Sequence, residues 1–119
     1  MAQIYHTDDH DTVVRKFAKL VEKNNPGKYQ VLTALSEGKS VEVGGVRPDI
    51  ILRSPDGKKT LLVIEVETAN TINETQAAER WKPISTAAPA FQLVIPKGNL
   101  PGAKRFCRRL DIKARFQEF

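Results

Sequence analysis

The chain has 119 residues, of which 40% are apolar and 28% are charged, and its formal net charge is +5. This composition is typical of a soluble globular protein, so we expect one domain over residues 1–119 with a core of its own. No apolar run is long enough to cross a membrane, the N-terminus is too polar for a signal peptide, and the single cysteine excludes an internal disulfide. We therefore expect a cytoplasmic protein, whose positive charge suits a polyanionic partner without requiring one.

The first predicted element is a helix that begins among residues 7–11 and ends near Asn24, before a Pro-Gly pair. Glu22 falls opposite the apolar stripe of this helix and should face solvent. The stripe consists of Val13, Val14, Phe17, Leu20 and Val21.

The start of this helix is rich in side chains that can bind a metal, namely His6, Asp8, Asp9 and His10. Caps and solvated charges are common at a helix start, so we interpret the group in that way. Asp9 and His10 would project towards the apolar stripe if the helix began early. The sequence assigns no functional role to these residues.

The segment that follows is less clear. Residues 28–35 suit either a short helix or a strand, and residues 40–43 predict a short strand. The pair Gly44-Gly45 predicts a turn or a close approach of two backbone segments.

Residues 46–68 predict a β-hairpin that carries acids on an apolar ribbon. The first apolar run follows Pro48-Asp49, and the second, residues 61–64, ends in Glu65-Val66-Glu67. Side chains alternate along a strand, so Glu65 and Glu67 share a face. An unpaired buried carboxylate is costly, and a metal ion is one common way to compensate it.

The turn of the hairpin decides whether Asp49 joins the two glutamates. A two-residue loop would send Asp49 to the opposite face, whereas a three-residue loop over residues 55–57 would put the three acids together. Pro55 in first place and Gly57 in third suit the longer loop, because its last position favours left-handed backbone. We therefore predict a cluster of Asp49, Glu65 and Glu67.

A helix over about residues 72–82 follows the hairpin, and Pro83 should end or kink it. The spacing of Thr71 and Glu74 is that of a capping box. Arg80 and Lys82 flank the packed side of the helix, and either could reach the carboxylates or remain solvated. The packed side is predicted to consist of Ala77, Ala78 and Trp81.

The chain then predicts a buried parallel strand over 90–95, a helix over 101–110 and an edge strand over 112–116. The apolar stripe of this helix includes Cys107, which we interpret as a core residue rather than a nucleophile. The stripe consists of Ala103, Phe106, Cys107 and Leu110. The opposite face carries cations that suit phosphates as well as solvent, namely Lys104, Arg105, Arg108 and Arg109.

A hairpin followed by a strand–helix–strand unit predicts an α/β fold, a mixed sheet with helices on both faces. In this setting Pro48-Asp49 and Glu65-Val66-Glu67 resemble the motif of the PD-(D/E)xK nuclease superfamily, whose restriction-endonuclease-like fold has the same core order. Glu67 stands where the motif usually has Lys. Some members carry Glu there and remain active, others move the Lys to the next helix, and some are inactive.

The resemblance implies a metal-dependent endonuclease that hydrolyses phosphodiester bonds in DNA. Asp49, Glu65 and the Val66 carbonyl would hold Mg²⁺ or Mn²⁺. Glu67 would orient or deprotonate the attacking water or touch a second ion, and Arg80 or Lys82 would stabilise the charged phosphate.

The resemblance also implies how the nucleic acid is held. The cations of the last helix would bind its backbone and carry little sequence information. A chain of this size would need a homodimer or a larger protein partner to cut both strands, and the predicted edge strand is one pairing surface.

Two other hypotheses stay open. In the first, the chain keeps the nuclease fold without catalysis and binds nucleic acid or a protein partner. In the second, it is an unrelated α/β domain whose acids form ion pairs with Arg47, Arg53 or Lys59. Asp49 and Glu65 on opposite faces of the sheet would favour the second.

Overall fold

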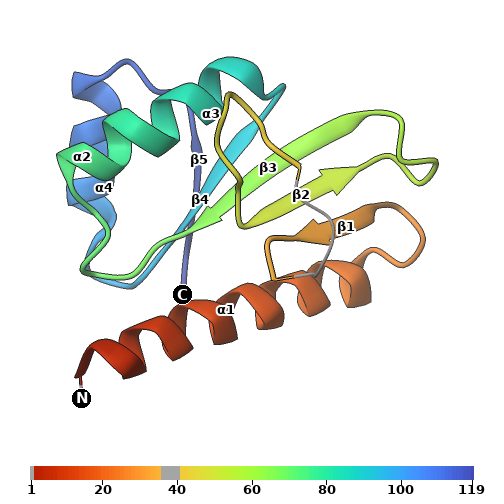
Figure 1. Cartoon of the computed structure of the whole chain (residues 1–119), viewed down its shortest axis with the longest axis horizontal. Coiled ribbons are helices and arrows are strands. Elements are labelled where there is room, and N and C mark those ends of the chain that lie inside the picture. Colours follow the sequence, from red (N-terminus) through yellow and green to blue (C-terminus); the bar gives the residue numbers. More distant parts are fainter. Residues whose placement is uncertain (1, 36–40) are drawn as a thin grey trace.

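The computed structural model describes residues 2–35 and 41–119, and within residues 2–9 it describes the backbone alone. The described part is a mixed α/β fold with an open five-stranded sheet (Figure 1). Its helical elements are α1 (Ala2–Asn24), α2 (Glu74–Gln76), the π-helical segment η1 (Ala77–Trp81), α3 (Lys82–Ala87) and α4 (Leu100–Arg109). Its strands are β1 (Gln30–Thr33), β2 (Ile50–Arg53), β3 (Thr60–Val66), β4 (Phe91–Ile95) and β5 (Arg115–Glu118).

The strands lie side by side in the order of the sequence, β1-β2-β3-β4-β5. The first three are antiparallel, and β4 and β5 continue the sheet in parallel. A parallel connection needs a crossover, and here a helical segment supplies each one. The segment α2–η1–α3 joins β3 to β4, and α4 joins β4 to β5 (Figure 1). The mixed sheet of the sequence analysis is confirmed.

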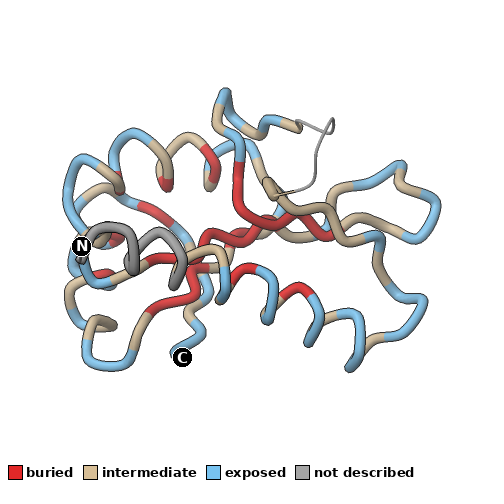
Figure 2. Tube along the Cα trace, turned by 60° about the horizontal axis from the view of Figure 1, so that its bottom comes forward, coloured by how far each residue is buried: buried red, intermediate tan, exposed pale blue. Residues whose placement is uncertain are grey.

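Helices cover both faces of the sheet, as predicted, and each face has its own apolar core (Figure 1). On one face Val14 and Ala18 of α1 pack with Ile64 of β3. On the other, Trp81 and Ala103 pack with strand residues that include Val63 and Leu93. The buried residues lie mainly in the central strands and at single positions of the helices (Figure 2). None of the described helices is both long and apolar enough to cross a membrane.

Helix α1 begins at Ala2, so residues 7–11 lie inside it and the prediction that they cap it is wrong. Its end at Asn24 and the exposure of Glu22 are as predicted. Leu20 was placed in the stripe wrongly, because its side chain is 50% exposed. At 100° per residue Ala18 lies much closer to the direction of Val14 than Leu20 does, and Ala18 is the buried residue.

The ambiguous stretch after α1 contains β1, which pairs with β2. Of the strand predicted over 40–43, residue 40 lies outside the described residues, and the rest shows one isolated bridge between Val43 and Val46. Gly44 makes the predicted close approach: its φ is 64°, and a Cβ there would collide with the Pro83 carbonyl oxygen. The loop before β2 is thereby held against α3.

The hairpin brings the acids together for a reason that differs from the predicted one. Near the turn the register is that of an even-sized loop, since Arg53 pairs with Thr60. A bulge next to this pair shifts the register by one residue, so that Leu52 pairs with Leu62 and Ile50 with Ile64. The three-residue loop is therefore wrong, but the bulge restores the side-chain parity that places Asp49 opposite Glu65.

The helical segment after β3 runs through Pro83 to Ala87 instead of ending there. Proline lacks an N–H and its ring crowds the preceding turn, which an ordinary α-helix tolerates poorly. The wide turn of η1, in which the Lys82 N–H reaches the Ala77 carbonyl, accommodates this break. The capping-box prediction is also wrong, because the cap is Asn73, whose side chain accepts the Gln76 N–H at 2.8 Å. Ala78 is exposed rather than packed.

The last three elements follow the prediction with shifted bounds. Strand β4 is buried and parallel to β3, and α4 packs through its apolar stripe. Strand β5 begins at Arg115, so most of the predicted range 112–116 precedes it, but it does form an edge of the sheet. Burial raises the pKa of the Cys107 thiol to about 11, which agrees with a core residue.

Candidate metal centre

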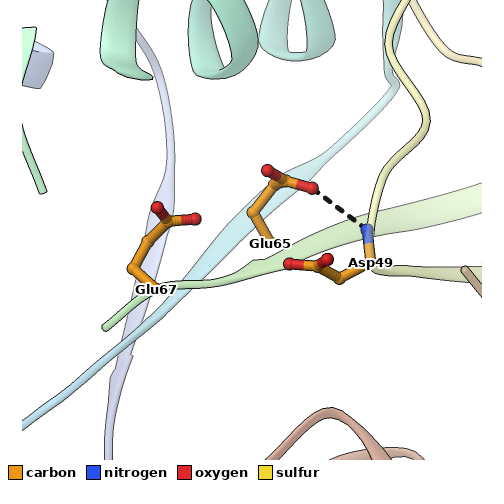
Figure 3. A group of neighbouring side chains, drawn as sticks. All are labelled: Asp49, Glu65 and Glu67. Atoms are coloured by element: carbon orange, nitrogen blue, oxygen red, sulfur yellow. Dashed lines mark hydrogen bonds between the residues drawn. The ribbon is translucent and has the colours of Figure 1, made fainter. Parts of the chain in front are cut away.

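Asp49, Glu65 and Glu67 form one cluster near the C-terminal end of the middle strand, β3 (Figure 3). Asp49 directly precedes β2, Glu65 lies in β3, and Glu67 directly follows β3. One carboxylate oxygen from each lies within 4.8 Å of the others. Asp49 is 8% exposed, and Glu65 and Glu67 are each 1% exposed. These acids are therefore removed from water, on a hairpin that is otherwise apolar. The predicted cluster is confirmed.

Asp49 is fixed from several sides. Its Oδ2 accepts the Val66 N–H at 2.7 Å and lies 3.3 Å from Nε2 of His10 on α1. The Nδ1 atom of His10 lies 3.1 Å from Asp11, and the Asp49 N–H donates to Glu65 Oε1 at 3.0 Å. Within the described residues, the other oxygen of Asp49 is left for a ligand. The hydrogen bond with Asp49 raises the pKa of His10 to about 9, so the imidazole is a cation at neutral pH.

Glu65 is bound at both oxygens by one guanidinium. Arg80 Nε donates to Oε2 at 2.9 Å and Arg80 Nη2 donates to Oε1 at 3.0 Å, and Nη2 also donates to the Arg47 carbonyl at 2.9 Å. Burial raises the pKa of Glu65, and the Asp49 carboxylate acts in the same direction. The bidentate pair with Arg80 opposes that rise, because it stabilises the charged form.

Glu67 is the least satisfied member of the cluster. Its Oε1 accepts from Gln76 Nε2 at 3.0 Å, and its buried Oε2 has no hydrogen-bond partner among the described residues. Burial raises the pKa of Glu67 to about 8, and the nearby Glu65 carboxylate adds to the rise. An orphaned buried oxygen is uncommon in a folded protein and calls for a ligand or a proton.

Without a metal, the cluster is balanced by two cations and one proton. Arg80 faces Glu65, protonated His10 faces Asp49, and the raised pKa of Glu67 favours its protonated form. A divalent ion would replace that proton and add further positive charge to the site. The carboxylates therefore have counter-charges without a metal, and Oε2 of Glu67 is the oxygen that lacks a partner among the described residues.

The carboxylates meet the requirements of a hard divalent ion. Mg²⁺ and related ions prefer oxygen ligands and keep several waters. At metal–oxygen distances of about 2.1 Å, neighbouring ligands of an octahedral ion lie about 3 Å apart and opposite ones about 4.2 Å, so oxygens that lie within 4.8 Å of one another would have to move closer together to share one ion. An open hollow of about 320 Å³ gives access from solvent. It is lined by His10, Asp49, Glu65, Val66, Thr71, Gln76 and Arg80.

The structure separates the two candidate cations on the helical segment. Arg80 reaches the cluster, whereas Lys82 Nζ donates to the Asp111 carbonyl at 3.1 Å. Lys82 is therefore removed from the proposed catalytic residues. The reason is the phase of the helix, which turns residues two positions apart in different directions.

Val66 lines the hollow, and its N–H has a role that was not predicted, as the donor to Asp49. The cations of α4, namely Lys104, Arg105, Arg108 and Arg109, are exposed. Two of them make contacts: Arg109 lies 3.4 Å from Glu74, and Lys104 lies over the Phe116 ring at 5.7 Å. No ion pair joins the acids of the cluster to Arg47, Arg53 or Lys59 among the described residues, and Asp49 and Glu65 lie together.

Two residues of the site were not assigned from the sequence. Gln76 lies four residues before Arg80, so helical spacing already places both on one side of the helix. His10 carries a weaker signal, because its approach to Asp49 depends on the early start of α1.

Comparison of the chain with protein-family models, curated proteins and solved structures gave no match.

Proposed function

We propose that this protein is a metal-dependent nuclease with a restriction-endonuclease-like fold, acting on phosphodiester bonds in DNA. One observation carries the proposal, the buried cluster of Asp49, Glu65 and Glu67 beside an open hollow that also contains a guanidinium. Carboxylates for a hard ion and a cation for phosphate are the two requirements of this reaction class. The sheet order and the helices on both faces agree with the proposed fold.

Each residue of the site has a proposed role. Asp49 and Glu65 would hold Mg²⁺ or Mn²⁺, and the Val66 carbonyl is the third proposed protein ligand. When bound, the ion lowers the pKa of a water molecule and stabilises charge on the phosphate. Glu67, whose Oε2 has no partner among the described residues, orients that water or accepts its proton once the ion has displaced the proton that the raised pKa favours without metal. Arg80 binds the phosphate oxygens.

The α4 cations form the proposed surface for the nucleic acid backbone. A homodimer or a larger protein partner would be needed to cut both strands of a duplex. Because phosphate contacts carry no sequence information by themselves, cleavage should show little sequence preference.

The test is Mn²⁺ binding by calorimetry, followed by cleavage of single-stranded, duplex and branched DNA. We expect Asp49→Asn to lose metal binding and cleavage, and Glu67→Gln to lose cleavage. Glu79→Gln is the matched control, since Glu79 is exposed on the same helical segment as Arg80. Full cleavage by pure Asp49→Asn protein would refute the assignment.

A nuclease-fold module without catalysis is the second candidate. It is favoured by the bidentate pair of Glu65 with Arg80, which satisfies a metal ligand without a metal, and by Glu67 in the place of Lys. Such a module would bind DNA or a protein partner equally well with and without divalent ions. Its affinity would also be unchanged in Asp49→Asn. The nuclease, by contrast, should depend both on divalent ions and on Asp49.

A further inference from the structure

Most of the lone-pair positions on the Glu65 oxygens, which the proposed metal would use, are already occupied. A carboxylate offers about four lone-pair positions. Three N–H groups fill positions on Glu65: the Asp49 amide at 3.0 Å, Arg80 Nη2 at 3.0 Å and Arg80 Nε at 2.9 Å. A divalent ion at the same oxygens would also face the guanidinium charge at close range, which is repulsive. Metal and Arg80 therefore compete for Glu65.

The surroundings of Arg80 allow its side chain to move away from Glu65. Its side chain is 32% exposed, whereas that of Glu65 is 1% exposed, so the arginine can turn towards solvent and the glutamate cannot. Apart from Glu65, its hydrogen-bond acceptor among the described residues is the carbonyl of Arg47 on the neighbouring loop. It projects from the π-helical segment η1 into the hollow that Asp49 and Glu65 line.

A phosphodiester offers Arg80 an equivalent partner. The planar guanidinium fork matches two phosphate oxygens as well as it matches a carboxylate. A phosphate in the hollow would thus replace Glu65 as the acceptor without leaving the guanidinium unpaired. Glu65 would then be released for the metal.

We propose that Arg80 is an exchangeable counter-ion, which closes the site by holding Glu65 and opens it by moving to the substrate phosphate. This inference rests on the proposed function and concerns the regulation of the same site. It makes metal and substrate binding mutually dependent, because each ligand removes an obstacle to the other. Such coupling is reciprocal, so the factor by which phosphate tightens metal binding equals the factor by which metal tightens phosphate binding.

The experiment measures Mn²⁺ affinity at pH 8 from the loss of the free-ion paramagnetic resonance signal. The titration is carried out with and without a saturating concentration of dimethyl phosphate, a small phosphodiester monoanion. In the wild type we expect the diester to tighten Mn²⁺ binding by about fivefold or more. In Arg80→Gln we expect tighter Mn²⁺ binding than in the wild type, and no further gain from the diester.

Two further variants make the result specific. Lys82→Gln removes the same charge two positions further along the helical segment but leaves Glu65 paired, so its diester effect should equal that of the wild type. Arg80→Lys keeps a cation beside Glu65 and therefore protects the fold if the glutamine variant is unstable. Because an ammonium cannot bind both oxygens as a fork, this variant should bind Mn²⁺ more tightly than the wild type and show a smaller diester effect.

The outcomes distinguish failure of the Arg80 exchange from failure of the proposed function. If the wild type binds Mn²⁺ but both Arg80 variants match it in affinity and in diester effect, the exchange is refuted and the metal site stands. If Lys82→Gln reproduces the effect of Arg80→Gln, the effect is one of net charge and the exchange is again refuted. If no variant binds Mn²⁺ in either condition, the proposed function itself fails.

Discussion

Asp49 takes the place of a strand partner beside Val66. Strand β2 pairs with β3 as far as Ile50 and Ile64, and beyond that pair the Val66 N–H donates to Asp49 Oδ2 at 2.7 Å. The same carboxylate is thus a structural acceptor and a proposed metal ligand. The two roles can be separated by substitution. One side-chain oxygen is enough to accept the Val66 N–H, whereas metal binding needs the carboxylate.

The first prediction uses that difference. Asp49→Ala should lower the free energy of unfolding by about 1–3 kcal/mol, because it leaves the buried Val66 N–H without an acceptor. Asp49→Asn keeps one oxygen for Val66, so most of the stability should remain while metal binding is lost. Urea unfolding and Mn²⁺ titration measure the two effects. An alanine variant as stable as the wild type would show that Val66 does not depend on this carboxylate.

The second prediction concerns the pH dependence of stability without metal. Burial raises the pKa of Glu67 from its ordinary value of 4.5 to about 8. Between these values the folded protein keeps a proton that the unfolded chain releases, so the free energy of unfolding falls as the pH rises from about 5 to about 8. His10, with a pKa raised to about 9 from 6.5, adds a further loss between those two values.

Glu67→Gln isolates the contribution of the carboxyl. This variant should lose the decline that Glu67 causes, which is on the order of a few kcal/mol, and keep those of His10 and of Glu65, whose pKa burial also raises. Urea unfolding at several pH values measures it, with Glu79→Gln as the control. A wild-type stability that rises over this range would contradict the protonated state of Glu67.

The third prediction links the proton of Glu67 to the metal. If the ion replaces this proton, the apparent Mn²⁺ affinity should rise by up to about tenfold per pH unit below pH 8 and level off above it. Calorimetry in buffers of different ionisation enthalpy counts the protons released. In Glu67→Gln the release should disappear, and equal proton release in both proteins would assign it to another group.

The fourth prediction concerns the loop that presents Asp49. Gly44 and Gly45 both have left-handed backbone, with φ of 64° and 80°. Alanine should therefore cost about 1 kcal/mol at either position. At Gly44 its Cβ would also collide with the Pro83 carbonyl oxygen, whereas nothing lies near that of Gly45. Thermal unfolding should show Gly44→Ala to be clearly the less stable variant, and equal losses would exclude the close approach.

The fifth prediction concerns the α4 surface. The double variant Arg105→Gln/Arg108→Gln should weaken DNA binding for every sequence and lower the salt slope of log K by about 2, since each phosphate contact contributes about 0.9. Arg15→Gln/Lys19→Gln is the matched control, because it removes the same charge from exposed positions of α1 on the other face of the sheet. Equal losses in both variants would assign binding to general charge rather than to α4.

Much of the architecture could be predicted because it depends on local patterns. The alternation along residues 61–67 placed Glu65 and Glu67 on one face, and helical spacing placed Cys107 in the core of α4. The pairing of a hairpin with a strand–helix–strand unit then predicted a mixed sheet. The bounds were less reliable at the start of α1, where several residues could cap the helix, and at the start of β5.

The contacts of the site could not be predicted in the same way, because they depend on register and on packing between distant segments. The bulge beside Arg53 follows from how two strands fit together, which the turn residues alone do not fix. Similarly, the π-helical turn before Pro83 depends on how the helical segment packs. From this turn Arg80 reaches Glu65, whereas Lys82 does not.

The sequence by itself determined which chemical groups are present and which of them share a strand face or a helix face, because backbone geometry imposes those periods on any chain. Only the tertiary structure decided that Asp49 lies opposite Glu65, that His10 reaches the cluster from α1 and that Arg80 holds both oxygens of Glu65. These contacts join residues between 15 and 39 positions apart in the chain. They depend on how the sheet and its two helical layers pack, which no local pattern encodes.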